Sequence, residues 1–177
     1  MDSKITKKGF SLIELLVVLA ILGILSTIVF AQMRSAKEQA KIAKAKSEIE
    51  EFAKMAVVAQ GVTGETLEEI TGTDCTICDC VGRNVQNIPG SDPCYIHWLE
   101  AVEAIEDATE GGAEGLADRI NRDPWGAPYG LNENEGETGP NDCRNDSIRS
   151  AGPDGIFENE DDYLLNIPLS KVCVSEE

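Results

Sequence analysis

The stretch that decides the fold lies near the start of the chain, where residues 7–31 read KKGFSLIELLVVLAILGILSTIVFA. From Phe10 to Ala31 it has 22 residues and a single charged side chain, that of Glu14. A helix of this length spans about 33 Å at ~1.5 Å per residue, which is enough to cross the hydrocarbon core of a bilayer. The positive flank before it, formed by Lys4, Lys7 and Lys8, favours a cytoplasmic N-terminus. The sequence therefore predicts one membrane-spanning helix with the head outside the cytoplasm.

The carboxylate of Glu14 argues against two simpler interpretations of this segment. A cleaved secretory signal peptide has an apolar core of only ~7–15 residues, and a plain signal anchor leaves the carboxylate unexplained. A carboxylate at bilayer depth costs about 2.5–3.5 kcal/mol, so an ionisable residue there indicates a function.

The string from Lys7 to Val18 resembles the signal of type IV prepilins and type II secretion pseudopilins. The resemblance implies that a prepilin peptidase cuts between Gly9 and Phe10, removes residues 1–9 as a leader and N-methylates Phe10. Glu14 then becomes the fifth residue of the mature chain. The resemblance implies that its carboxylate forms an ion pair with the protonated N-terminal amine of a neighbouring subunit, so that two buried charges neutralise each other during assembly. Pairing of Glu14 with Phe10 of the same helix, its i, i+4 neighbour, is the alternative.

The same helix is predicted to continue beyond the membrane to Gln60. Residues 32–60 contain no Gly or Pro, and Gly61 and Gly64 are predicted to end the helix. One apolar stripe recurs at spacings of three and four residues: Ile42, Ala45, Ile49, Phe52, Ala56 and Ala59. Charged residues are predicted on the other faces: Lys37, Glu38, Lys41, Lys44, Lys46, Glu48, Glu50 and Glu51.

The remaining predicted elements are short. An apolar face predicts a helix from Trp98 to about Thr109, and Leu116 and Ile120 predict a helical turn. The acids around this helix are predicted to form a solvated face: Glu100, Glu103, Glu106, Asp107, Glu110 and Glu114. Strands are predicted at 127–131, 147–150 and 163–167. The fold class is α+β, with a long N-terminal transmembrane-plus-amphipathic helix packed on a small antiparallel sheet, a Cys-rich loop insertion and a C-terminal acidic loop.

This organisation predicts three parts of the chain. Residues 1–9 form the cleaved leader, residues 10–31 form the transmembrane half of the helix that drives assembly, and residues 32–177 form an extracytoplasmic, pilin-like head.

Six cysteines in a head outside the cytoplasm predict disulfide bonds. Four of them lie within 20 residues and are expected to form two bridges among themselves, with the pairing left open: Cys75, Cys78, Cys80 and Cys94. Cys75-x2-Cys78 and Cys94-x2-His97 also have the spacing of zinc ligands, an alternative that the oxidising compartment disfavours. A third bridge, Cys143–Cys173, is suggested by its location, which resembles that of the C-terminal disulfide loop of type IV pilins.

The C-terminal third carries a second resemblance. Residues 122–129 read RDPWGAPY, residues 150–155 read SAGPDG and residues 161–163 read DDY. These segments are similar to the head of the major pseudopilin of type II secretion, and the resemblance implies that the loop wraps a structural calcium ion. Trp125 and Tyr129 are expected to pack within the head.

Calcium prefers six to eight oxygen ligands, and the loop offers several. The candidate ligands are the carboxylates of Asp154, Asp161 and Asp162 and the hydroxyl or carbonyl of Ser150, while Glu158, Asn159 and Glu160 lie in the same loop as possible substitutes. Gly152 and Gly155 permit the positive φ angles that a tight wrap requires. An acidic surface loop that binds nothing is the alternative.

Composition excludes several classes of function. With 15 Lys and Arg against 32 Asp and Glu, the formal net charge is −17, which disfavours nucleic-acid binding. The chain has one histidine, His97, and shows no nucleophile–base pair or phosphate-binding loop, so we predict that it is not an enzyme.

The sequence favours a structural subunit of a type II secretion pseudopilus or a closely related type IV pilus-like filament. The subunit is expected to be anchored in the inner membrane by a single span and then assembled into a periplasmic or cell-surface filament. The implied partners are its own copies, minor pilins or pseudopilins, the prepilin peptidase, and an inner-membrane assembly platform with its ATPase. One alternative is a surface type IV pilus subunit for adhesion, motility or DNA uptake, favoured by the large head and the cysteines. The other is a membrane-anchored metal- or ligand-binding module.

Overall fold

The computed structural model describes residues 12–73, 75–135 and 143–170. It divides the chain into two units, residues 1–40 and residues 41–177, which are described separately. The predicted boundary between residues 31 and 32 marks a different property, the end of the apolar run.

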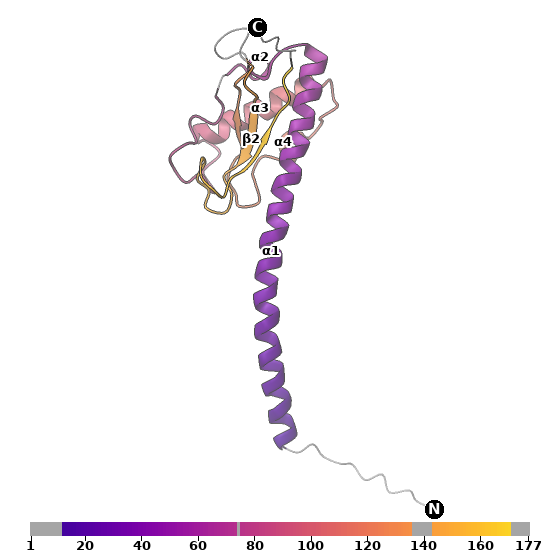
Figure 1. The fold of residues 1–177 in the computed structure, drawn as a ribbon, viewed down its shortest axis with the longest axis vertical. Coiled ribbons are helices and arrows are strands. Elements are labelled where there is room, and N and C mark those ends of the chain that lie inside the picture. The colour runs from indigo at the N-terminus through magenta and orange to yellow at the C-terminus, as the bar shows by residue number, and fades with distance from the viewer. Residues whose placement is uncertain (1–11, 74, 136–142, 171–177) are drawn as a thin grey trace, which may run out of the picture. The chain divides into compact units, whose positions relative to one another are not determined.

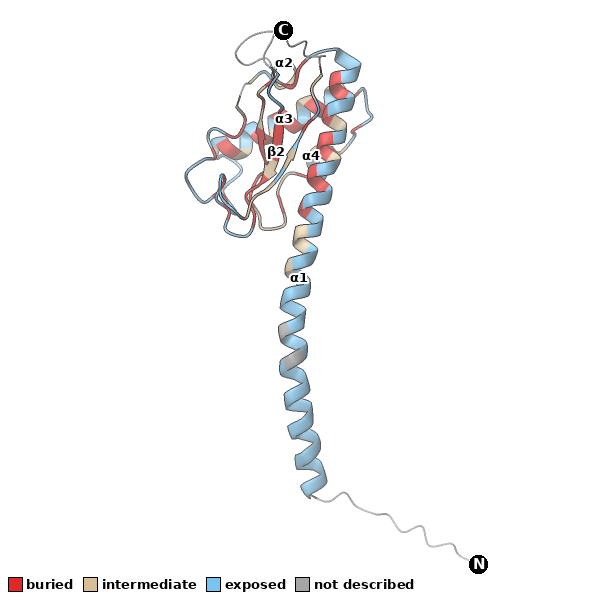
Figure 2. Cartoon of the chain, in the orientation of Figure 1, coloured by how far each residue is buried: buried red, intermediate tan, exposed pale blue. Residues whose placement is uncertain are grey.

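Helix α1 runs from Leu12 to Thr63 and contributes to both units (Figure 1). In the first unit, every described side chain from Leu12 to Lys37 is exposed, although most of them are apolar up to Phe30 (Figure 2). The helix is long and apolar enough in this region to cross a membrane. Exposed leucines, isoleucines and valines along a helix of this length are typical of a segment whose surroundings are lipid or other helices rather than water.

In the second unit, α1 carries the predicted apolar stripe into the core. Ala45, Phe52, Ala56 and Ala59 are completely buried and Ile49 nearly so, which confirms the stripe. The helix continues three residues past the predicted Gln60, because Gly61 lies inside α1, and it ends at Thr63, directly before the predicted Gly64. Gly64 then donates its N–H to the carbonyl of Gln60 at 2.8 Å and closes the last turn.

Three short helices follow. Helix α2 (Leu67–Thr71) was not predicted, although Thr66 and Glu69 form a capping box in which each side chain accepts the other residue's N–H. Helix α3 (Pro93–Ala108) begins before the predicted Trp98, because Asp92 caps its N-terminus and Pro93 suits its first turn. Helix α4 (Leu116–Arg119) is the predicted helical turn.

The sheet has three antiparallel strands in the order β1 (Gly130–Asn132), β2 (Ser147–Ser150) and β3 (Tyr163–Asn166). Leu131 pairs with Ile148, which pairs with Leu165. The second strand has the predicted bounds and the third nearly so. The first begins at Gly130 instead of residue 127, because residues 123–127 form a turn closed by the hydrogen bond from the N–H of Asp123 to the carbonyl of Ala127.

The main core lies where α1, α3 and the sheet meet. The ring of Trp98 on α3 lies 5.2 Å from that of Phe52 on α1 and 5.5 Å from that of Tyr129, measured between ring centroids. Its indole N–H donates to the carbonyl of Ile120 at 3.0 Å, so the buried polar atom has a partner.

A second core surrounds the Cys-rich segment, residues 75–94. Its buried members come from three parts of the chain: Ile77, Cys80, Val85, Cys94, Ala127, Ala151 and Phe157. The segment was predicted to be a loop insertion with little apolar content, and in the structure it supplies its own buried cluster. Because the Cys-rich segment packs against Ala127, Ala151 and Phe157, it helps to position the residues of the candidate sites.

Candidate functional site

The residues of the predicted processing site, Gly9 and Phe10, lie outside the described residues. Glu14 lies in the first turn of α1, and its side chain is exposed. The first turn of a helix leaves backbone N–H groups without intrahelical partners and carries a partial positive charge, which suits a carboxylate. The role of Glu14 in assembly remains a prediction.

The motif that begins at Asp123 forms a turn built around one carboxylate. Oδ1 of Asp123 accepts the N–H groups of Trp125 and Ala127, each at 2.9 Å, and Oδ2 accepts the hydroxyl of Ser150 at 2.7 Å. Burial raises the pKa of Asp123, and these hydrogen bonds partly offset that effect. The motif therefore acts structurally, by joining the turn before β1 to the end of β2.

Both aromatic residues of this motif pack within the head, as predicted. The ring of Trp125 stacks on that of Tyr163, with centroids 5.9 Å apart and planes inclined by 7°. Tyr129 is almost completely buried, and its hydroxyl donates to the carboxylate of Glu48 on α1 at 2.6 Å.

Glu48 is a residue that the sequence prediction misplaced. It was assigned to a solvated face of the helix, yet it is only 9% exposed. Burial, reinforced by the neighbouring Glu48 carboxylate, raises the pKa of Tyr129 well above its ordinary value, so the hydroxyl remains a donor. The Nζ atom of Lys44 lies 3.4 Å from Glu48 and partly balances its charge. The hydrogen bond between Tyr129 and Glu48 fixes α1 to the segment that precedes β1.

The acidic loop between β2 and β3 directs its carboxylates toward its own backbone. Asp154 accepts the N–H of Ile156 at 2.8 Å, Asp162 accepts the N–H of Glu158 at 2.7 Å, and Asp161 accepts the N–H of Asp154 at 3.3 Å. The hydroxyl of Ser150, in contrast, is directed at Asp123. Among the described residues, no three His, Cys, Asp or Glu side chains gather as a metal centre would require.

One buried carboxylate oxygen of this loop has no hydrogen-bond partner. Oδ1 of Asp162 is buried without a donor, and the N–H at Nε of Arg149 is buried without an acceptor. Nη1 of the same guanidinium lies 4.0 Å from Oδ2 of Asp162. Burial raises the pKa of Asp162. A buried carboxylate oxygen without a donor is chemically suited to a cation, so the structure preserves Asp162 as a candidate ligand.

The Cys-rich segment holds the other side of this loop. The N–H of Val85 donates to the carbonyl of Gly155 at 2.8 Å, the side-chain amide of Gln86 donates to the carbonyl of Pro153 at 2.7 Å, and that of Asn84 donates to the carbonyl of Asp154. The carbonyls of residues 153–155 are thus already paired with protein donors.

Two glycines allow this close packing, as the sequence predicted. Gly152 and Gly155 have φ angles of +64° and +71°. A Cβ atom at Gly152 would lie 2.4 Å from the carbonyl oxygen of Asp161, and one at Gly155 would lie 2.4 Å from Cγ of Gln86. Any side chain at either position would therefore displace the loop.

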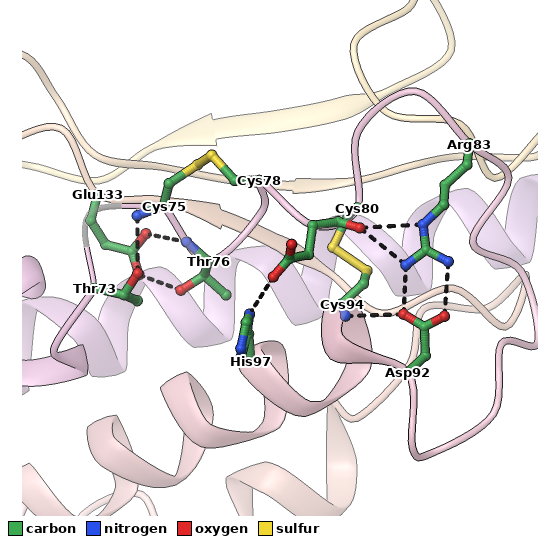
Figure 3. A network of polar contacts seen from close by, with 11 residues as sticks. Thr73, Cys75, Thr76, Cys78, Cys80, Arg83, Asp92, Cys94, His97 and Glu133 are labelled. Atoms are coloured by element: carbon green, nitrogen blue, oxygen red, sulfur yellow. Dashed lines mark hydrogen bonds and ion pairs between the residues drawn. A yellow bond between two sulfur atoms is a disulfide. The ribbon is translucent and has the colours of Figure 1, made fainter.

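The first four cysteines form two disulfides, Cys75–Cys78 and Cys80–Cys94 (Figure 3). Cys80 and Cys94 are completely buried, whereas Cys78 is exposed. With both pairs oxidised, these thiols are not available to a zinc ion. Cys143 is also disulfide-bonded. Cys173 lies outside the described residues, so the Cys143–Cys173 pairing remains a prediction.

His97, the remaining member of the predicted zinc set, has a different partner. Its Nδ1 lies 2.9 Å from Oδ2 of Asp79, and both side chains are exposed (Figure 3). Nearby, the guanidinium of Arg83 donates to Asp92, the residue that caps α3, at 2.8 Å. The hydrogen bond from Arg83 lowers the pKa of Asp92. These polar contacts tie the Cys-rich segment to the start of α3.

Glu133 is a buried acid that the sequence analysis did not single out. Its carboxylate accepts the N–H of Thr76 at 3.0 Å and the hydroxyl of Thr76 at 2.6 Å (Figure 3). It also accepts the hydroxyl of Thr71 at 3.1 Å. The N–H of Ile77 also donates to the carbonyl of Leu131 at 2.9 Å. Together these bonds attach the Cys-rich segment to the end of β1.

We expect Glu133 to make stability depend on pH. Burial raises its pKa to about 7, from an ordinary value of 4.5, because the hydrogen bonds only partly offset desolvation. The unfolded chain ionises first as pH rises, so stability should fall between pH 4.5 and 7, by roughly 3 kcal/mol.

The variant Glu133→Gln keeps the shape of the neutral acid and cannot ionise. Denaturant unfolding of wild type and variant, measured at intervals from pH 4.5 to 7.5, isolates the contribution of Glu133 from those of other buried acids. The difference in unfolding free energy should grow in favour of the variant as pH rises. A difference that stays constant across this range would contradict the prediction.

Comparison with known proteins connects the two ends of the chain. A family model described as a prokaryotic N-terminal methylation motif matches residues 5–30. The type II secretion system core protein G of Escherichia coli (strain K12) is 31% identical over 165 residues, which cover 93% of this chain and 94% of that one. The chain belongs to the core protein G family of type II secretion systems. Core protein G of Klebsiella pneumoniae is 28% identical over 156 residues, and that of Pseudomonas aeruginosa is 28% identical over 162 residues.

Membership of the core protein G family rests on more than the leader. The methylation motif covers only the first part of α1, whereas the match to each of these two further relatives covers 88% of this chain and more than nine-tenths of the relative. No solved structure matches the chain. The resemblance seen in the N-terminal signal and in the Asp123 motif is thereby confirmed, and the small antiparallel sheet with one long apolar helix agrees with a pilin-like fold.

Proposed function

We propose that this chain is a structural subunit of a type II secretion pseudopilus. The observation that carries the proposal is the first unit of α1, in which an apolar surface long enough to cross a bilayer is fully exposed. Such a surface is stable in lipid before assembly and against the same segments of other copies after assembly. The similar proteins of Escherichia coli, Klebsiella pneumoniae and Pseudomonas aeruginosa are core proteins G of type II secretion systems, which supports this kind of assembly over a surface pilus.

The proposal includes the route by which the subunit is made. The chain is inserted in the inner membrane with its head outside the cytoplasm, cut between Gly9 and Phe10 by a prepilin peptidase, and methylated on Phe10. Its partners are other copies of itself, minor pseudopilins, and an inner-membrane assembly platform with its ATPase. The methylation motif matched over residues 5–30 supports the processing step.

The N-terminus of the native protein tests the proposed route. We expect intact-mass and N-terminal analysis to show a chain that begins at N-methylated Phe10, because the lysines before Gly9 hold the scissile bond at the cytoplasmic face. Electron microscopy of sheared and periplasmic fractions then locates the filament. A mature terminus at Gln32 would mean that the apolar segment is an ordinary signal peptide and would overturn the proposal.

We also propose that the loop between β2 and β3 binds calcium through its carboxylates. The donor set fits in part: Asp154, Asp161 and Asp162 all belong to one loop, and Oδ1 of Asp162 is a buried acceptor without a partner. The Ser150 hydroxyl and the carbonyls of residues 153–155 are occupied by protein partners, so the remaining ligands would be backbone oxygens elsewhere in the loop and water. A bound ion would supply positive charge to the acidic side chains of this loop.

Calcium is therefore expected to stabilise the folded head. At a concentration one hundred times the dissociation constant, a ligand adds about 2.7 kcal/mol, which corresponds to a rise in Tm of roughly 5–10 °C for a chain of this size. Asp162→Asn should remove most of this rise, whereas Asp118→Asn, which changes an exposed acid outside the loop, should retain it. If the Tm of the wild-type protein is the same with calcium and with a chelator, the loop is an acidic surface loop only.

A further inference from the structure

The cations of the mature chain are concentrated on one part of α1. Three of the 15 Lys and Arg residues leave with the leader, and five of the remaining 12 lie within residues 34–46. Four of these five follow the spacing i, i+3, i+7 and i+10: Arg34, Lys37, Lys41 and Lys44. At 100° per residue, these positions lie within about 80° of one another around the helix, so they share one face. We call it the basic face of α1.

Among the residues that the structure describes, the basic face of α1 has few acidic partners. Arg34 and Lys37 are exposed, and neither forms an ion pair with another described residue. Lys41 lies 5.8 Å from the ring centroid of Trp125, which leaves its positive charge uncompensated by an acid. Lys44 has a carboxylate partner in the described part of the chain, Glu48, and its side chain is still 60% exposed.

An acidic face with the same spacing lies on α3. Glu100, Glu103 and Asp107 stand at i, i+3 and i+7, and Glu110, at i+10, follows the end of the helix. All four side chains are exposed, and none is ion-paired within the described part of the chain. They point away from the core, because the opposite side of α3 buries Trp98, Val102 and Ile105. We call this the acidic face of α3.

The two faces are complementary in sign and in spacing. The pattern 0, 3, 7, 10 is unchanged when it is read backwards, so four cations can face four acids whether the helices run parallel or antiparallel. Over ten residues the charges extend about 15 Å along each helix axis. A protein surface that docks favourably on either face carries the opposite sign, and each face provides it for the other.

The identity of the partner follows from the net charge. Removal of the leader, which carries three lysines and Asp2, takes the formal charge of each subunit from −17 to −19. Subunits with this charge repel one another when packed closely, and a basic surface set against an acidic one offsets the repulsion locally. A contact between two different faces of identical copies is heterologous, and its repetition generates an open helical filament.

We propose that the basic face of α1 in one copy docks on the acidic face of α3 in the next copy of the filament. This inference rests on the proposed function, because it specifies the contact that a pseudopilus subunit makes with its neighbour. It assigns the charged exteriors of α1 and α3 to recognition between subunits.

Charge reversal in the full-length protein tests the contact. Lys37→Glu and Glu103→Lys should each reduce the filament yield, quantified by immunoblot of sheared filaments, by about tenfold, since each places like charges across the interface. Lys37→Glu combined with Glu103→Lys restores opposite charges if the helices run parallel, and Lys37→Glu combined with Asp107→Lys restores them if they run antiparallel. One of these two double variants should therefore recover most of the yield. Glu65→Lys, which makes the same change at an exposed acid outside the acidic face, serves as the matched control and should leave the yield unchanged.

A second measurement avoids substitutions altogether. Zero-length carbodiimide cross-linking of wild-type filaments should produce peptides that join Lys37 or Lys41 to Glu103 or Asp107, and these should be absent from detergent-dispersed monomers. Single reversals with wild-type yield, or failure of both double variants to exceed the single variants, would overturn the contact. Absence of the cross-linked peptides from wild-type filaments would overturn it as well. Loss of binding to anionic phospholipid vesicles by Lys37→Glu, without loss of filaments, would assign the basic face to lipid instead. Failure of the wild-type chain to form any filament would overturn the proposed function itself, a separate outcome.

Discussion

Replacing Glu14 with alanine is expected to abolish filament formation while leaving membrane insertion intact. A carboxylate within the bilayer costs about 2.5–3.5 kcal/mol, so its removal should make insertion easier. In the filament, the same change leaves the amine of a neighbouring Phe10 buried without its counter-charge. An uncompensated buried charge costs about 3–5 kcal/mol, which weakens the addition of each subunit by at least a hundredfold.

The comparison variant for this experiment is Ser26→Ala. Ser26 is a polar residue of the same helix whose hydroxyl already donates to the carbonyl of Leu22 at 2.7 Å, so its loss should not affect assembly. Membrane fractionation reports insertion, and electron microscopy with immunoblotting of sheared filaments reports assembly. Normal filament yield from Glu14→Ala cells would mean that the carboxylate pairs within its own helix or plays no part in assembly.

The elements that sequence reasoning placed best are those with a local period. The apolar stripe from Ala45 to Ala59 is buried because α1 presents the same face to the sheet over four turns. Helix α4 likewise agrees with its apolar spacing, and strand β2 has the predicted bounds. The start of α3 was missed although its signal was local, because Asp92 is a cap followed by a proline at the first helical position. The apolar face of the helix, taken alone, predicted a start at Trp98.

The elements that sequence reasoning missed depend on contacts between distant residues. Glu48 has the spacing of an exposed helical residue, and only its hydrogen bond to Tyr129, 81 residues away, accounts for its burial. Glu133 follows a strand, and its sequence context is that of an exposed loop residue. It is buried because it bonds to Thr76, which lies 57 residues earlier in the chain. Neither pair has a periodic signal, because a single long-range hydrogen bond leaves no pattern in the sequence around it.

The Cys-rich segment illustrates the same limit at a larger scale. Six cysteines allow fifteen pairings, and spacing alone does not choose among them. Its role in holding the loop also could not be predicted, because Val85 and Gln86 bond to the backbone of Pro153 and Gly155, and any residue provides a backbone carbonyl. What the sequence did indicate was the chemistry of the segment, oxidised thiols in a head outside the cytoplasm.

Removing the Cys80–Cys94 disulfide is expected to destabilise the head more than removing Cys75–Cys78. Closing a loop of about 15 residues stabilises the folded state by about 3 kcal/mol in the chain-entropy model, against about 2 kcal/mol for a loop of four. Cys80 and Cys94 are also buried in the second core, beside Val85 and Phe157, so their loss also disturbs packing. Cys78 is exposed, and its bridge spans three residues within one turn of the chain.

Thermal unfolding of two double variants under oxidising conditions measures the difference. Cys80→Ala with Cys94→Ala should lower Tm by roughly 6–12 °C, and Cys75→Ala with Cys78→Ala should lower it by less. Limited proteolysis should then cut the first variant within residues 81–92, because the bridge from Cys80 to Cys94, at the start of α3, no longer closes that loop. The calcium response should weaken in the same variant, since Asn84, Val85 and Gln86 hold the loop that carries Asp154. Equal losses of Tm in the two variants would mean that the second core, rather than either bridge, keeps the Cys-rich segment in place.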